Sequence, residues 1–144
     1  MLIRDTLAAL VLLGCAVLLA SCAGFDAQAM NGPCLDDTPV CVGQRTEMVH
    51  AMSSDSGHHW IAEAPGRDTV ASGVRLFAYQ NVRDKLSCSE LANGIAEMDA
   101  AKQVLADGPA TGQTMLRHNQ IKAMTDDVRA ALVVSRTRKC GTGT

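Results

Sequence analysis

An apolar run from Leu7 to Ala20 constrains this chain more than any other feature of its sequence. Arg4 is the only basic residue ahead of the run, and small residues (21–24) follow it directly. The run has the length of a signal-peptide core, whereas a transmembrane helix needs roughly 20 apolar residues. The sequence therefore predicts an exported protein whose folded part begins after this run.

The run ends in Leu19-Ala20-Ser21-Cys22, which is an aliphatic residue, two small residues and a cysteine. These four residues resemble the lipobox of a bacterial lipoprotein precursor, and the resemblance covers only about residues 1–22. It implies removal of residues 1–21 and acylation of Cys22, which would anchor the protein in the membrane. Ala23 follows the cysteine, and in the Gram-negative pattern this implies the outer membrane, with the protein facing the periplasm.

Three alternatives to this processing remain open. Leu12-Leu13-Gly14-Cys15 also resembles a lipobox, although its apolar region would be short. Ordinary cleavage after an A-x-A-like site, at residues 21–23 or 27–29, would release a soluble secreted protein. An uncleaved run would be an N-terminal anchor helix.

The rest of the chain divides into a tether, one domain and a short tail. Residues 22–33 lack hydrophobic periodicity and end in Asn31-Gly32-Pro33, which predicts a flexible tether. Residues 34–140 have the length of one small domain, and residues 141–144 are the tail. The chain has 144 residues and a net charge of −2, so neither charge nor pattern indicates a nucleic-acid partner.

Four cysteines remain in the predicted domain, namely Cys34, Cys41, Cys88 and Cys140. An even number in an exported domain favours two disulfides, and four cysteines allow three pairings. We favour a short local bridge from Cys34 to Cys41 and a long one from Cys88 to Cys140. A zinc site is the alternative, but the spacing is not that of a zinc motif.

Hydrophobic periodicity and caps predict an all-α domain of about four helices. The expected helices span about residues 39–52, 68–84, 88–106 and 114–137. The first expected helix should bury Cys41, Val42, Met48, Val49 and Met52. The second should bury Val70, Val74, Phe77 and Ala78. Residues 73–79 could instead form a strand, since several of them prefer β structure.

The last two expected helices explain why we favour the long disulfide. A short loop joins them, so they should pack antiparallel. The start of the third helix, with Cys88, then lies beside the end of the fourth, with Cys140. A bridge there would close a loop of about 50 residues and stabilise the domain by a few kcal/mol in the chain-entropy model.

No motif in the chain specifies a reaction. There is no G-x-S-x-G sequence and no Gly-rich phosphate loop, so we expect a non-catalytic protein without a cofactor. The expected function is a structural or interaction module of the cell envelope, with the lipid membrane and another envelope protein as partners. The alternative is a copper-binding protein, because thioether and imidazole suit copper; its ligands would be Met48, Met52, His58 and His59.

Overall fold

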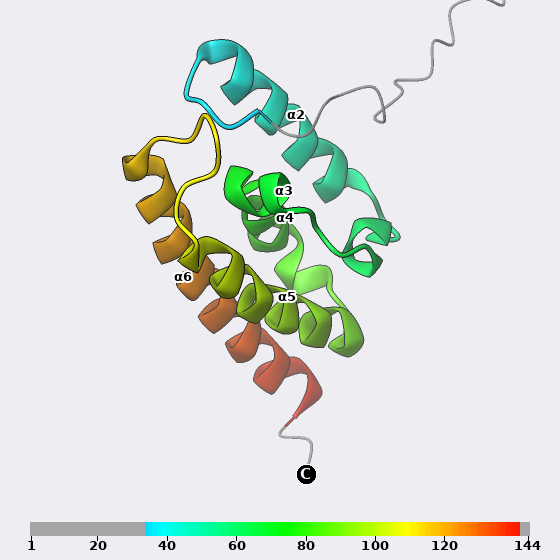
Figure 1. Cartoon of the computed structure of the whole chain (residues 1–144). Helices are drawn as coiled ribbons and strands as arrows, with labels where there is room; N and C mark the ends of the chain where they lie inside the picture. The colour runs from blue at the N-terminus through cyan, green and yellow to red at the C-terminus, as the bar shows by residue number, and fades with distance from the viewer. Residues whose placement is uncertain (1–33, 142–144) are drawn as a thin grey trace, which may run out of the picture. The chain divides into compact units, whose positions relative to one another are not determined.

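The computed structural model describes residues 34–141. They form five α-helices and two short 3₁₀ helices, with no strand among them (Figure 1). Their bounds are α2 Pro39–Ser54, η1 His59–Ala62, α3 Arg67–Ser72, α4 Val74–Val82, η2 Arg83–Lys85, α5 Cys88–Ala106 and α6 Met115–Cys140. The all-α class is confirmed, with one helix more than expected. The lipobox, Cys22 and the tether lie outside the described residues.

Hydroxyl side chains begin the three longest helices. Thr38 caps α2, where its Oγ1 accepts a hydrogen bond from the backbone N–H of Cys41 at 3.3 Å. Ser87 caps α5 in a capping box, because its Oγ accepts from the N–H of Glu90 while the Glu90 carboxylate accepts from the N–H of Ser87. Thr114 caps α6 in the same manner as Thr38. These three helix starts are those that the sequence predicts.

The expected helix at 68–84 is interrupted, which corrects the sequence-based prediction. Gly73 has φ of 75°, a left-handed conformation, and separates α3 from α4. A Cβ at Gly73 would lie 2.3 Å from Cδ1 of Ile121, so the bend also lets α6 approach closely. The strand alternative for 73–79 is wrong, since residues 74–82 are helical.

The last two long helices, α5 and α6, form an antiparallel hairpin that carries much of the core (Figure 1). Residues buried on α6 recur at spacings of three and four, from Ile121 through Val128 to Leu132. Gly94 of α5 allows close packing here, because a Cβ would lie 2.8 Å from the ring of Tyr79. The buried core cluster comprises Trp60, Ile61, Leu76, Ala78, Tyr79, Val82, Leu86, Leu91, Met98, Leu105, Ile121, Val128 and Leu132.

Both favoured disulfides are present. Cys34 pairs with Cys41 across a Cα–Cα distance of 5.4 Å, and Cys88 pairs with Cys140 across 5.9 Å. The second bridge joins the start of α5 to the end of α6, as the antiparallel arrangement requires. Within the described residues, no helix combines the length and apolarity needed to cross a membrane.

The predicted apolar faces of α2 and α4 need two corrections. Val42 and Phe77 are exposed, at 46% and 38%, although the pattern assigns both to the core. Arg45, which the pattern does not assign to the core, is buried on α2 beside Cys41. Where α2 packs on α4, the charged side chain of Arg45 is therefore buried, and the apolar side chains of Val42 and Phe77 are exposed.

Candidate functional site

A groove of about 310 Å³ runs between α2 and α4. We call it the α2–α4 groove. Its lining combines apolar side chains with two arginines, and comprises Val42, Arg45, Thr46, Val49, Ser72, Val74, Phe77, Asn81 and Arg117. Both side chains that depart from the predicted apolar pattern, Val42 and Phe77, line this groove.

Arg45 is fixed by the loop that precedes α2. Its side chain is only 7% exposed, and its Nη1 donates to the backbone oxygens of Cys34 at 2.9 Å and Asp36 at 2.6 Å. Its Nη2 donates to Oδ1 of Asp37 at 3.4 Å. The Cys34–Cys41 disulfide holds this loop against α2, so it also fixes the carbonyls that orient the guanidinium.

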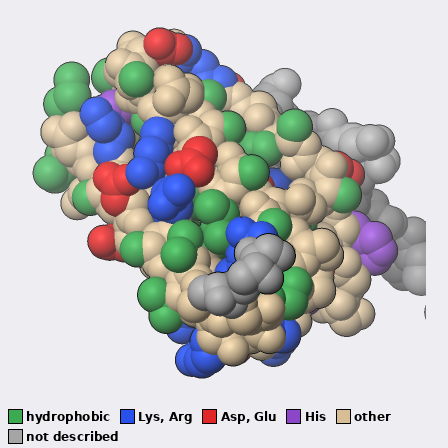
Figure 2. All heavy atoms as spheres, turned by 90° about the horizontal axis from the view of Figure 1, so that it is seen from below, with side chains coloured by type: hydrophobic (Ala, Val, Ile, Leu, Met, Phe, Trp, Pro, Cys, Tyr) green, Lys and Arg blue, Asp and Glu red, His purple; other side chains and the backbone are tan. Residues whose placement is uncertain are grey.

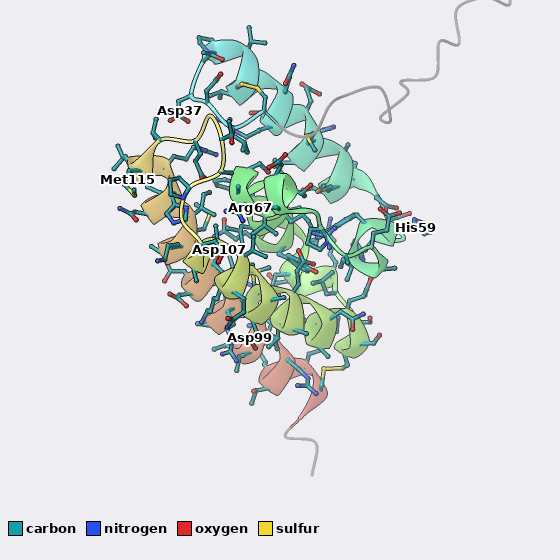
Figure 3. The ribbon with its side chains drawn as sticks, in the orientation of Figure 1. Asp37, His59, Arg67, Asp99, Asp107 and Met115 are labelled. Atoms are coloured by element: carbon teal, nitrogen blue, oxygen red, sulfur yellow. A yellow bond between two sulfur atoms is a disulfide. The ribbon has the colours of Figure 1, made fainter. Side chains whose placement is uncertain are left out.

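Arg117, in the first turn of α6, reaches the same loop. Its Nη1 donates to Oδ1 of Asp37 at 3.3 Å, and its Nη2 donates to the backbone oxygen of Ser72 at 3.0 Å. Its Nε is buried and has no hydrogen-bond partner within the part of the chain that the structure describes. Figure 3 shows Asp37 near Met115, where the start of α6 meets the loop before α2.

These contacts leave the groove short of negative charge. Two guanidinium groups share one oxygen of one carboxylate, that of Asp37, which is itself half exposed. Burial lowers the pKa of Arg45, and the like charge of Arg117 lowers it further, against the opposing effects of Asp37 and Asp36. Arginine stays protonated in proteins, and no carboxylate is among the residues that line the groove. Such a site favours an anion.

Exposed apolar side chains lie in and beside the groove. Val42 and Phe77 are exposed and line it, and exposed Leu116 is the neighbour in sequence of Arg117, which also lines it. Exposed Val40 and Met115 lie two helical positions, or about 200°, from Val42 and Arg117, so they project away from the groove. We call the groove and Leu116 together the α2–α4 face.

Another surface of the molecule balances its own charges. On α5 and α6, Arg129 pairs with Asp99 at 2.6 Å and Lys102 pairs with Asp126 at 2.6 Å. Figure 2, seen from below, shows acidic and basic side chains beside one another. A hollow of about 680 Å³ beside Cys88 includes Arg129, which pairs with Asp99, and Arg136.

Another arginine, Arg75, lies in the core, and each of its three side-chain nitrogen atoms donates a hydrogen bond within the protein. Nε and Nη2 of Arg75 donate to the two carboxylate oxygens of Glu97 at 2.6 and 2.5 Å, and Nη1 donates to the backbone oxygen of Trp60. The hydroxyl of Tyr79 donates to the same carboxylate at 2.8 Å. The ring centroids of Trp60 and Tyr79 are 4.7 Å apart, so α4, α5 and η1 meet in one network.

The residues predicted from sequence are dispersed in the structure. Met48 and Met52 are partly buried on α2, and Met52 packs against the core. Nδ1 of His58 lies 2.8 Å from Glu90 of α5, whereas Nδ1 of exposed His59 lies 3.1 Å from Asp55. The two imidazoles therefore interact with carboxylates on different elements.

One group of possible metal ligands occurs among the described residues, at the start of the domain. It consists of Cys34, Asp36 and Cys41, but both sulfur atoms are joined in a disulfide. A thiolate is the form that binds a metal, so this group offers no thiolate while the bridge is intact. The zinc alternative for these cysteines is thereby excluded in the folded domain.

Sequence reasoning did not identify the two arginines of the groove, Arg45 and Arg117, or Asp37, which pairs with both of them. Arg45 could have been found, because it follows Cys41 by four residues and so shares the face of α2 that the disulfide turns inward. Arg117 and Asp37 carry no such signal, since 80 residues separate them and only the fold brings them together.

The chain matches no protein-family model, no curated protein and no solved structure. Its function is therefore argued from its own residues and geometry.

Proposed function

We propose that the protein is a non-catalytic binding module of the bacterial cell envelope. Acylated Cys22 anchors it, in the outer membrane and facing the periplasm, and residues 22–33 link the anchor to the helical domain. The α2–α4 face binds the partner, which is another envelope protein.

The observation that carries this proposal is the composition of the α2–α4 face. Arg45 and Arg117 have one carboxylate between them, beside apolar side chains that the core does not use. Interfaces between proteins concentrate apolar residues and arginine in the same way. The two disulfides agree with an exported domain, because such bonds persist in oxidising compartments.

The anchor is tested by the intact mass of protein extracted from membranes, before and after reduction and alkylation. We expect a chain that begins at Cys22 and carries acyl groups, with four thiols released on reduction. A chain without lipid that begins at Gly24 or Met30 would show a diffusible secreted protein and contradict the anchor.

The binding face is tested by photo-crosslinking in intact membranes from two matched positions of α6. Leu116 is 71% exposed beside the groove, and Val134 is 63% exposed near the other end of the same helix. A photoreactive residue at 116 should give a protein adduct of discrete mass, and one at 134 should not. Adducts of equal yield at both positions, or none at either, would contradict the assignment of this face.

A further inference from the structure

We propose that the α2–α4 groove binds the C-terminal carboxylate of a partner polypeptide whose last residue is apolar. The inference rests on the proposed function, because it names the chemistry by which the α2–α4 face recognises its partner.

The charge of the groove calls for one added anion. Two guanidinium groups offer ten N–H donors. Within the described residues, Arg45 makes three hydrogen bonds and Arg117 makes two, so half of these donors have no acceptor there. Asp37 supplies the only carboxylate hydrogen-bonded to either arginine in that part of the chain. A carboxylate accepts several hydrogen bonds from guanidinium groups and would supply the acceptor that the groove lining lacks.

The walls of the groove call for an apolar group next to that anion. Val42, Val49, Val74 and Phe77 line the same groove as the two arginines. Its volume of about 310 Å³ lies at the low end for ligand pockets. This suits one apolar side chain and the carboxylate attached to its own residue, as at a chain end. A long hydrocarbon chain would remain largely exposed in so small an open groove.

The surface beyond the groove indicates that the ligand is part of a larger molecule. Leu116 does not line the groove, yet it is 71% exposed next to Arg117, which does. A free small molecule in the groove would leave Leu116 uncovered, whereas a protein that reaches past the groove can cover it.

The other polar residues of the groove favour a chain end over an internal acidic residue. The Thr46 hydroxyl donates to the backbone oxygen of Val42, and the Ser72 hydroxyl donates to that of Thr69. The amide of Asn81 donates to Ser53. Because both hydroxyl hydrogens and one amide hydrogen of Asn81 are already bonded, the groove offers few donors to a backbone that runs through it. A C-terminal residue presents its carboxylate with little further backbone that would need hydrogen-bond partners in the groove.

The test compares peptides that differ only in charge at the C-terminus. The full chain is placed in nanodiscs of zwitterionic lipid and titrated with a pool of acetyl-Ser-Gly-Ser-Gly-Ala-X peptides. X is Val, Leu, Ile or Phe, and each pool is made as the free acid and as the amide. We expect the free acids to bind at least about tenfold more tightly than the amides, which corresponds to one charge-assisted interaction.

Matched arginine variants on one helix assign the binding to the groove. Arg117→Gln should weaken free-acid binding about tenfold, while Arg117→Lys retains part of it. Arg138→Gln, at an exposed arginine of α6 that pairs with Asp84, should leave binding unchanged. Urea unfolding of each variant separates lost binding from lost fold. Arg45 is not varied, because it also holds the loop before α2.

Three results would overturn the proposal. They are equal binding of acids and amides, binding that Arg117→Gln and Arg138→Gln affect alike, and no binding of either pool. Dodecanoate added to the same nanodiscs gives a further contrast, since its binding in place of the peptides would identify a lipid ligand. The crosslink from position 116 depends on none of these titrations. An adduct at position 116 without a preference for free acids would support the binding module but contradict recognition of a C-terminal carboxylate.

Discussion

Two arginine sites among the described residues differ in what surrounds the guanidinium groups. In the core, Arg75 meets both oxygens of the Glu97 carboxylate, which Tyr79 also contacts, and the backbone of Trp60. At the α2–α4 groove, two arginines share a single oxygen of Asp37. The core arginine therefore has two carboxylate oxygens as acceptors, whereas the two arginines at the groove have one between them.

The direction of the pKa shifts expresses the same contrast. Burial acts to lower the pKa of Arg75, but hydrogen bonds and attraction to Glu97 outweigh burial, so the pKa is raised. For Arg45, burial and the charge of Arg117 prevail, so the pKa is lowered. A buried ion pair is costly to break and contributes to structure, whereas arginines with free N–H donors beside a groove retain capacity for a ligand. This difference is why we assign binding to the second site.

The largest expected effect comes from removing the charge balance of the core arginine site. Glu97→Ala leaves the guanidinium of Arg75 buried without its carboxylate, and we expect the free energy of unfolding to fall by about 3–5 kcal/mol. Urea unfolding with the disulfides intact measures this change. Glu47→Ala, at an exposed residue of α2, is the matched control and should stay within about 0.5 kcal/mol. Similar losses in both variants would mean that the Arg75–Glu97 pair contributes no more to the free energy of unfolding than an exposed residue does.

A smaller change dissects the same network. Tyr79→Phe removes one hydrogen bond to the Glu97 carboxylate but keeps the aromatic ring beside Trp60. Hydrogen bonds to charged groups contribute about 1.5–3 kcal/mol, so we expect a loss of that size in the free energy of unfolding. A loss below about 0.5 kcal/mol in urea unfolding would show that Arg75 alone satisfies the carboxylate.

The helices, their caps and both disulfides could be predicted because their signals are local or follow from antiparallel packing. Thr38, Ser87 and Thr114 lie directly before apolar periodicity, and the joined helices placed Cys88 near Cys140. The break at Gly73 could not be predicted in this way. It depends on the approach of Ile121, which is 48 residues away in sequence and which leaves no room for a side chain.

The candidate site was missed for a related physical reason. The periodic pattern assigns every apolar residue of a stripe to the core, so it placed Val42 and Phe77 inside. The pattern places only apolar residues inward, so it left out Arg45, whose acceptors are backbone oxygens of a loop and an acidic residue before the helix. The only local signal for Arg45 is its spacing of four residues from Cys41. Local rules thus fail where α2 meets α4, and such failures are expected at functional sites.

Removing the carboxylate that pairs with both arginines should separate stability from binding. Asp37 is half exposed, so Asp37→Asn should change the free energy of unfolding by less than about 1 kcal/mol. The groove becomes more positive, and a charge about 4 Å away in water contributes about 1 kcal/mol, so free-acid peptides should bind about fivefold more tightly. Asp84→Asn, which changes an exposed residue that pairs with Arg138, is the control. Weaker peptide binding to Asp37→Asn would show that Asp37 orients the arginines for the ligand.

The smallest effect concerns the other acidic residue of the loop before α2. Hydrogen bonds from the hydroxyl and the backbone N–H of Thr38 lower the pKa of Asp36 below 3.8, its ordinary value. A lowered carboxyl pKa adds stability above pH 3.8, and this is lost as the pH falls through the folded-state pKa. Asp36→Asn keeps the acceptor oxygen but removes the charge, so wild type should be the more stable at pH 6. Urea unfolding should show the two curves converging as the pH is lowered below 3.8. A difference in the free energy of unfolding that stays constant with pH would mean that the Thr38 hydrogen bonds stabilise the loop without a contribution from the charge of Asp36.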